Sequence, residues 1–323
     1  MSYLFKLWYH ENKSFAEYLI ELTELNNYNP EIEKLRTGKR FAENPEMIKN
    51  ILYLDIPDVI ITYGFPEKPI LGVEFCAEAP SGHDVFQRVA RVAAAAEFGA
   101  PFAFIFPEKK WVIREKMGGR WDLYNPLSMR ALINIGRLHK IPILAFFWEA
   151  DQTYGNKAQG FLQMDEEFEN LPDRNTAEIR KFIEFVNKII YYTNKNLPFS
   201  EMVYDPFVSE REAWMWRKYC SRFERKPDLF RWSPLTSCRL LKTEQLIDII
   251  NEKIGRAVDL PQYILSRDEC IVYEPRTKQF RADPYAGSLI GIDYLVCRTG
   301  QTIRHRYRTV SYTHLTLPTK RIV

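Results

Sequence analysis

The chain has 323 residues, of which 46% are hydrophobic and 27% charged. This composition supports a packed core and excludes an intrinsically disordered chain. Lys and Arg number 45 against 42 for Asp and Glu, a net charge of +3, so any basic binding surface must be local.

The sequence lacks the features of a secreted or membrane protein. It begins without the pattern of a secretory signal and has no run of about 18 apolar residues, so we expect a cytoplasmic protein with no membrane partner. The five cysteines are far apart and include no C-x-x-C pair, which indicates neither a disulfide framework nor a zinc site.

The first 150 residues show an α/β pattern. Helices are predicted over residues 13–26 and 43–53, the second preceded by a capping Asn44 and Pro45. The β-branched runs 58–64 and 70–78 are separated by the turn sequence FPEKP and predict a hairpin.

The pattern continues with a second helix-and-strand unit. A helix is predicted from Asp84 to about Phe98, ended by Gly99, and the apolar run 101–107 predicts a strand buried on both faces and parallel to its neighbour. A basic hairpin over 109–122, a helix over 127–139 and a buried strand over 141–148 follow.

The composition changes after residue 150. Residues 151–175 are polar and acidic and predict a linker or insertion. Residues 176–310 predict a second, mainly helical domain, with helices over 176–195, 208–225 and 243–255 and short strands at 270–273 and 289–297. The last segment, 311–323, resembles read-through of sequencing adapter; we expect it to be non-native and the helical domain to be truncated, the alternative being a true C-terminal strand.

Two acidic residues form the sharpest candidate site. Asp58 opens one strand of the predicted hairpin and Glu74 follows after 15 intervening residues, inside the partner strand, so their carboxylates can converge. Two close carboxylates repel each other unless a cation separates them, and a divalent metal with oxygen ligands does so. The alternatives are a turn or capping role for Asp58 and a solvated strand face for Glu74.

This order of residues resembles the PD-(D/E)xK nuclease superfamily over roughly residues 43–107. The resemblance implies a restriction-endonuclease-like α/β fold, with a mixed sheet flanked by helices. It also implies Mg²⁺-dependent or Mn²⁺-dependent cleavage of DNA, with RNA as the alternative substrate. Asp58 and Glu74 would be the metal ligands, Gln87 of the following helix a positioning residue, and Glu46 of the preceding helix a further acid.

The sequence departs from this family at one position. The family places Lys two residues after the Glu, where this chain has Cys76, and a thiol does not replace that cation. Either Glu78, Gln87 or Arg88 compensates, or the domain is an inactive nuclease-like module that binds nucleic acid or protein. A second alternative is a thiol hydrolase in which His83 activates Cys76.

A second region is rich in basic and aromatic residues. Residues 210–242 contain nine Lys or Arg against four Asp or Glu, a combination that suits phosphate neutralisation and base stacking. Helical spacing places Lys218, Arg222 and Arg225 near one side together with Arg211. We therefore expect this region, with Arg88, to bind nucleic acid; the alternative is an ordinary amphipathic helix packed on a core.

Overall fold

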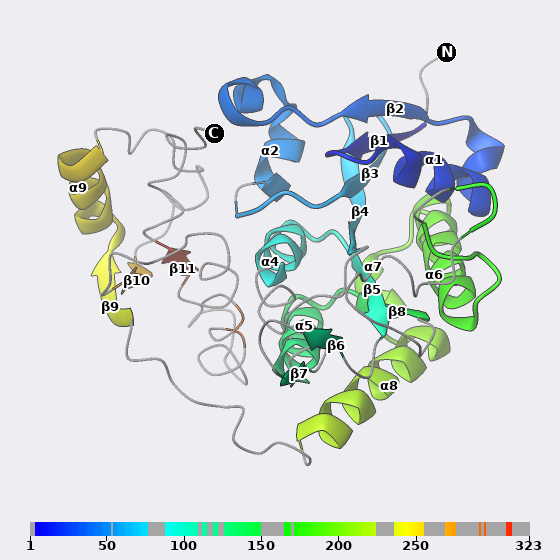
Figure 1. The fold of residues 1–323 in the computed structure, drawn as a ribbon. Helices are drawn as coiled ribbons and strands as arrows, with labels where there is room; N and C mark the ends of the chain where they lie inside the picture. Colours follow the sequence, from blue (N-terminus) through cyan, green and yellow to red (C-terminus); the bar gives the residue numbers. More distant parts are fainter. Residues whose placement is uncertain are drawn as a thin grey trace.

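The protein is described here from a computed structural model. Its described residues are 4–52, 54–76, 88–108, 112–114, 119–121, 126–149, 165–168, 171–223, 236–254, 269–275, 291, 294 and 308–311. These residues form an α/β fold built on a six-stranded mixed sheet flanked by helices (Figure 1). The predicted α/β class is confirmed in this form.

The main sheet combines antiparallel and parallel pairings. Its strands are β1 (Phe5–Tyr9), β2 (Glu31–Lys34), β3 (Val59–Tyr63), β4 (Lys68–Phe75), β5 (Phe102–Glu108) and β8 (Ile143–Glu149). Their order is β2-β1-β3-β4-β5-β8. Strands β1, β3 and β4 pair antiparallel, whereas β2 is parallel to β1, and β4, β5 and β8 are mutually parallel. The predicted hairpin and the predicted parallel strand at 101–107 are both confirmed.

Helices cover both faces of this sheet. They are α1 (Lys13–Leu22), α2 (Glu46–Leu52), α4 (Val89–Glu97), α5 (Pro126–His139), α6 (Ala177–Asn194), α7 (Phe199–Met202) and α8 (Pro206–Phe223). Two 3-10 segments, Glu24–Tyr28 and Gly38–Glu43, connect the early elements. Helices α2, α4 and α5 lie on one side of the sheet, and α1 and α6 on the other (Figure 1).

The alternation of side chains along β4 separates the two faces. Phe75 stacks on Phe15 of α1, with ring centroids 4.7 Å apart. The neighbouring Glu74 contacts arginines at the start of α4, on the opposite face. Successive side chains of a strand point to opposite faces, so an apolar layer lies on the α1 side and a polar site on the α4 side.

Two glycines have distinct roles near α4. A Cβ atom at Gly72 would lie 2.6 Å from Cδ2 of Phe102, so glycine at this position of β4 leaves room for the Phe102 ring. Gly99 has a positive φ of 74°, a conformation that suits glycine, and it follows the end of α4 as predicted. The start of the helix predicted from Asp84 lies outside the described residues.

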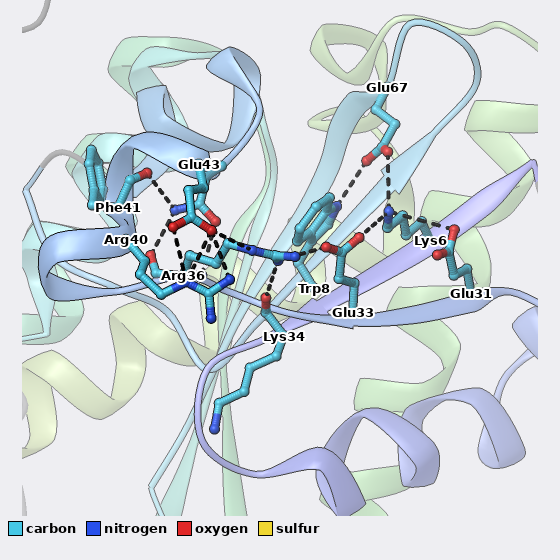
Figure 2. A network of polar contacts seen from close by, with 11 residues as sticks. Lys6, Trp8, Glu31, Glu33, Lys34, Arg36, Arg40, Phe41, Glu43 and Glu67 are labelled. Atoms are coloured by element: carbon cyan, nitrogen blue, oxygen red, sulfur yellow. Dashed lines mark hydrogen bonds and ion pairs between the residues drawn. The ribbon is translucent and has the colours of Figure 1, made fainter.

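Strands β1 and β2 were not predicted from the sequence, and polar contacts hold them in the sheet. Figure 2 shows Lys6 of β1 between Glu31 and Glu33 of β2 and Glu67 of the β3–β4 turn. The indole N–H of Trp8 donates to Glu67 at 2.9 Å. The charged edge strand β2 is therefore held to β1 by ion pairs as well as by its backbone ladder.

The core of the sheet extends beyond the predicted domain boundary at residue 150. Phe182 of α6 packs on Phe146 of β8, and Met215 of α8 is fully buried in the same hydrophobic cluster. The later part of the predicted linker also packs on the sheet domain, since Tyr18 of α1 donates a hydrogen bond to the carbonyl of Pro172 at 2.7 Å. The division into two domains stays a prediction.

The remaining elements form smaller units. The basic hairpin is present as β6 (Val112–Arg114) and β7 (Gly119–Trp121). A second sheet contains β9 (Thr236–Lys242), β10 (Glu269–Pro275) and β11 (Arg308–Ser311), next to α9 (Thr243–Ile254) along the chain. Of the strand predicted over 289–297, Gly291 and Tyr294 are described and both are helical, so that prediction is wrong at these positions. Strand β11 reaches Ser311, and residues 312–323 lie outside the described residues.

Candidate functional site

The hairpin brings Asp58 and Glu74 together at one end of the sheet. Val59 is paired with Val73, which places Asp58 beside Glu74 on the adjoining strand. The backbone N–H of Phe75 donates to Oδ2 of Asp58 at 2.7 Å, and the N–H of His10 donates to the Asp58 carbonyl at 2.9 Å. Asp58 is thus held between β4 and the end of β1.

Glu74 is a buried carboxylate with an unusual distribution of partners. Its Oε1 accepts hydrogen bonds from Nε of Arg88, at 2.6 Å, and from Nη1 of Arg91. The residue has no exposed surface, and within the described part of the chain Oε2 has no hydrogen-bond partner. The predicted alternative of a solvated face for Glu74 is therefore wrong, because α4 covers it.

Arg91 links Glu74 to a third acidic residue. Its Nε donates to Oδ2 of Asp55 at 2.7 Å, while Oδ1 of Asp55 accepts the N–H of Ile56 at 2.8 Å. The Arg91 side chain is 15% exposed. One guanidinium therefore joins α4 to both β4 and the segment that precedes β3.

The electrostatics of this cluster follow from burial and from the close carboxylates. Burial, and then the charge of Glu74, raises the pKa of Asp58 to about 8. The carboxylates of Glu74 and Asp55 outweigh the effect of burial and raise the pKa of Arg91, which stays protonated. Burial lowers the pKa of His10. The guanidinium groups of Arg88 and Arg91 contact the acidic residues Glu74 and Asp55 of this cluster.

Cys76 lies at the position where the resemblance implies Lys. It is 5% exposed, and its backbone N–H donates to the carbonyl of Ile105 at 2.9 Å, which anchors it between β4 and β5. The thiol is therefore poorly accessible to a substrate. His83, its proposed partner in a thiol hydrolase, lies outside the described residues.

The structure describes some of the other predicted site residues and not others. Arg88 lies at the start of α4 and contacts Glu74. Glu46 opens α2, where it is 73% exposed and pairs with Lys49 at 2.6 Å. Glu78 and Gln87 lie outside the described residues, so their roles stay predictions.

The basic region on α8 differs from the prediction at one residue. Arg211 is 3% exposed, pairs with Glu178 and donates to the carbonyl of Ala145 at 2.8 Å, so its grouping with a nucleic-acid-binding face is wrong. Its guanidinium covers the edge of β8 and stacks 3.6 Å from the Trp214 ring.

The remaining basic residues of this region keep their predicted roles as hypotheses. Lys218 is half-buried and lies over the Trp214 ring at 5.1 Å. Arg222 belongs to α8, although its side chain is not described, and Arg225 lies outside the described residues.

Sequence reasoning missed Asp55, Arg91 and His10. The spacing of Arg88 and Arg91 could have indicated that both face the same strand, since residues three apart share a helix face. Asp55 and His10 carry no comparable local pattern, because their proximity depends on the packing of β1 and of the segment before β3.

The donor set fits a hard divalent cation. Among the described residues, no group of three or more His, Cys, Asp or Glu side chains is arranged to hold a metal. Mg²⁺, however, is commonly held by one or two carboxylates together with waters and substrate phosphates. Such a pair is present in Asp58 and in Oε2 of Glu74, which has no hydrogen-bond partner among the residues that the structure describes.

Comparisons with known proteins identify no relative. No protein-family model, curated protein or solved structure matches this chain. In the described part of the chain, no helix is long and apolar enough to cross a membrane.

Proposed function

We propose that the protein is a metal-dependent endonuclease that hydrolyses phosphodiester bonds in DNA. The observation that carries this proposal is the buried Glu74 carboxylate, whose Oε2 lacks a hydrogen-bond partner among the described residues, beside Asp58. Buried polar atoms are nearly always paired, so an unpaired carboxylate oxygen next to a second carboxyl group favours a bound cation.

Each residue of the proposed site would have a separate role. Asp58 and Glu74 would hold Mg²⁺ or Mn²⁺, which when bound supplies a cation that activates water and stabilises charge on the phosphate. Asp58 would have to release its proton to solvent to serve as a ligand, because ligation requires the carboxylate form. The restriction-endonuclease-like fold belongs to this proposal, and Gln87 and Glu78 keep the positioning and accessory roles that the resemblance implies.

Arg88 is the best placed substitute for the lysine that Cys76 replaces. It lies 2.6 Å from Glu74, and its side chain is 24% exposed, so it extends from the buried carboxylate to the surface. A guanidinium recognises phosphate well through its fixed donors. Arg88 would therefore bind the phosphate of the substrate beside the metal.

A specific observation favours a second candidate, an inactive nuclease-like binding module. Oε1 of Glu74 already accepts two guanidinium groups, and Cys76 stands at the lysine position. In such a module the arginines would permanently neutralise Glu74, and the protein would bind nucleic acid without cutting it. The thiol hydrolase is less favoured because Cys76 is 5% exposed.

A cleavage assay separates these functions. Purified protein is incubated with supercoiled plasmid, linear duplex DNA, single-stranded DNA and RNA, each with Mg²⁺, Mn²⁺ or chelator. We expect cleavage of DNA with either metal and none with chelator. DNA binding without cleavage under every condition would support the inactive module, and cleavage in chelator would contradict a metal-dependent mechanism.

A further inference from the structure

We propose that Arg91 is a positioning residue that holds Glu74 through Oε1 so that Oε2 remains available to a divalent cation, and that Asp55 in turn holds Arg91. This inference rests on the proposed function, because it assigns the support of the same metal site. The two supporting residues, Arg91 and Asp55, are not among those that the sequence resemblance implies.

The contacts of Arg91 link the side chains of Glu74, Arg91 and Asp55 into a chain of hydrogen bonds, the Arg91 relay. Nη1 donates to Oε1 of Glu74 and Nε donates to Oδ2 of Asp55, while the other oxygen of Asp55 is occupied by the N–H of Ile56. The three residues come from β4, α4 and the segment before β3. Each contact restricts the next, so the orientation of the Glu74 carboxylate depends on the relay.

The distribution of hydrogen bonds on Glu74 argues for positioning rather than simple neutralisation. A guanidinium that only neutralised a buried carboxylate would favour a bidentate contact with both oxygens. Here Arg88 and Arg91 both contact Oε1, and Oε2 has no partner in the described part of the chain. Such an arrangement is explained if the second oxygen serves a ligand.

A charge-conserving substitution separates the two roles. Arg91→Lys keeps the positive charge but loses the planar fork that contacts two carboxylates at once, whereas Arg91→Gln removes the charge. A positioning role predicts that Arg91→Lys weakens Mn²⁺ binding about 10- to 100-fold, the usual effect of removing a group that orients a metal ligand. A purely neutralising role predicts unchanged affinity for Arg91→Lys and tighter binding for Arg91→Gln.

The measurement is calorimetric titration of the full chain with Mn²⁺ alone, with circular dichroism to verify each fold. Arg40→Lys is the matched control, because Arg40 is 66% exposed and pairs with Glu43; we expect its Mn²⁺ affinity to equal that of wild type. Asp55→Asn tests the same relay if Arg91→Lys does not fold, and we expect it also to weaken binding at least 10-fold.

Cleavage kinetics provide a second readout. If Arg91 positions a metal ligand, the Mn²⁺ concentration that gives half-maximal cleavage rises in Arg91→Lys, and saturating Mn²⁺ restores most of the maximal rate. A merely structural role would instead change the amount of folded enzyme without moving this concentration.

The outcomes distinguish this inference from the proposed function. If Glu74→Gln weakens Mn²⁺ binding but Arg91→Lys and Asp55→Asn do not, the positioning role is overturned and the metal site stands. If wild type binds no Mn²⁺, or binds it equally after Glu74→Gln, the metal site itself is wrong and the role of Arg91 is overturned with it.

Discussion

Replacing Glu74 by Ala would remove the carboxylate that accepts hydrogen bonds from both Arg88 and Arg91. Both guanidinium groups contact Oε1 of Glu74, and their side chains are only 24% and 15% exposed. The substitution therefore leaves two mostly buried cations with one fewer anion, and we expect it to destabilise the protein.

The size of the effect can be worked from these contacts. Removing one partner of a buried ion pair costs about 3–5 kcal/mol. Two effects reduce this cost. Arg91 keeps its contact with Asp55. The loss of Oε2 also removes a buried oxygen that has no partner in the described part of the chain, and burying such an oxygen costs about 1–3 kcal/mol. We expect a net loss of about 2 kcal/mol for Glu74→Ala.

Glu74→Gln provides the matched comparison. Its amide oxygen can accept both guanidinium hydrogen bonds and its shape is retained, so we expect a smaller loss of about 1 kcal/mol. Urea unfolding at neutral pH without metal measures both values. If Glu74→Ala were within about 0.5 kcal/mol of wild type, the range of an ordinary surface substitution, the buried charge cluster would not contribute as described.

Three further predictions concern other parts of the molecule. Arg174 lowers the pKa of Asp165 to about 2, so this carboxylate contributes stability above pH ~4 that is lost as the pH falls towards ~2. Asp165→Asn should therefore lower the free energy of unfolding by about 2 kcal/mol at neutral pH. It should also weaken the pH dependence of this free energy, measured by urea unfolding, in the acid range; an unchanged pH dependence would refute the assignment. Replacing Lys218, Arg222 and Arg225 together by Gln should weaken DNA binding, and each lost phosphate contact should lower the log-log salt slope by about 0.9; an unchanged slope would indicate an ordinary helix face. Cys76→Ser should retain most of the metal-dependent cleavage, whereas a loss of orders of magnitude would point to a thiol nucleophile.

The parts of the fold that were predicted are those with strong local patterns. Strands β3, β4, β5 and β8 are apolar runs bounded by Pro, Gly or polar residues, and α5 and α6 show apolar residues at helical spacing. Strands β1 and β2 were missed because FKLWY contains a lysine and no β-branched residue, and EIEK is mostly charged. Strand β2 depends on Lys6 and on pairing with β1, which a local pattern does not reveal.

The same distinction applies to the candidate site. The proximity of Asp58 and Glu74 follows from a hairpin with a short turn, so the sequence was sufficient to predict it. The relay from Glu74 through Arg91 to Asp55 depends on how α4 packs on the sheet. The burial of Arg211 likewise depends on Glu178, 33 residues away, and therefore could not be read from the spacing of basic residues on α8.

The central claim is that Asp58 and Glu74 jointly hold a divalent cation with which the protein cleaves DNA. The Asp58→Asn variant tests this claim most directly. Because burial and the charge of Glu74 raise the pKa of Asp58 to about 8, this side chain is largely uncharged at neutral pH, and Asn can still accept the hydrogen bond from Phe75. We therefore expect Asp58→Asn to fold with near wild-type stability. The control is Glu43→Gln, which removes a charge from a carboxylate paired with Arg40.

The decisive measurement is the rate of plasmid cleavage at saturating Mn²⁺ for wild type, Asp58→Asn and Glu43→Gln, each shown by circular dichroism to be folded. The proposed site predicts that wild type and Glu43→Gln cleave at similar rates and that Asp58→Asn loses at least about 100-fold, as expected when a metal ligand is removed. Cleavage by folded Asp58→Asn at the wild-type rate would contradict the proposed site.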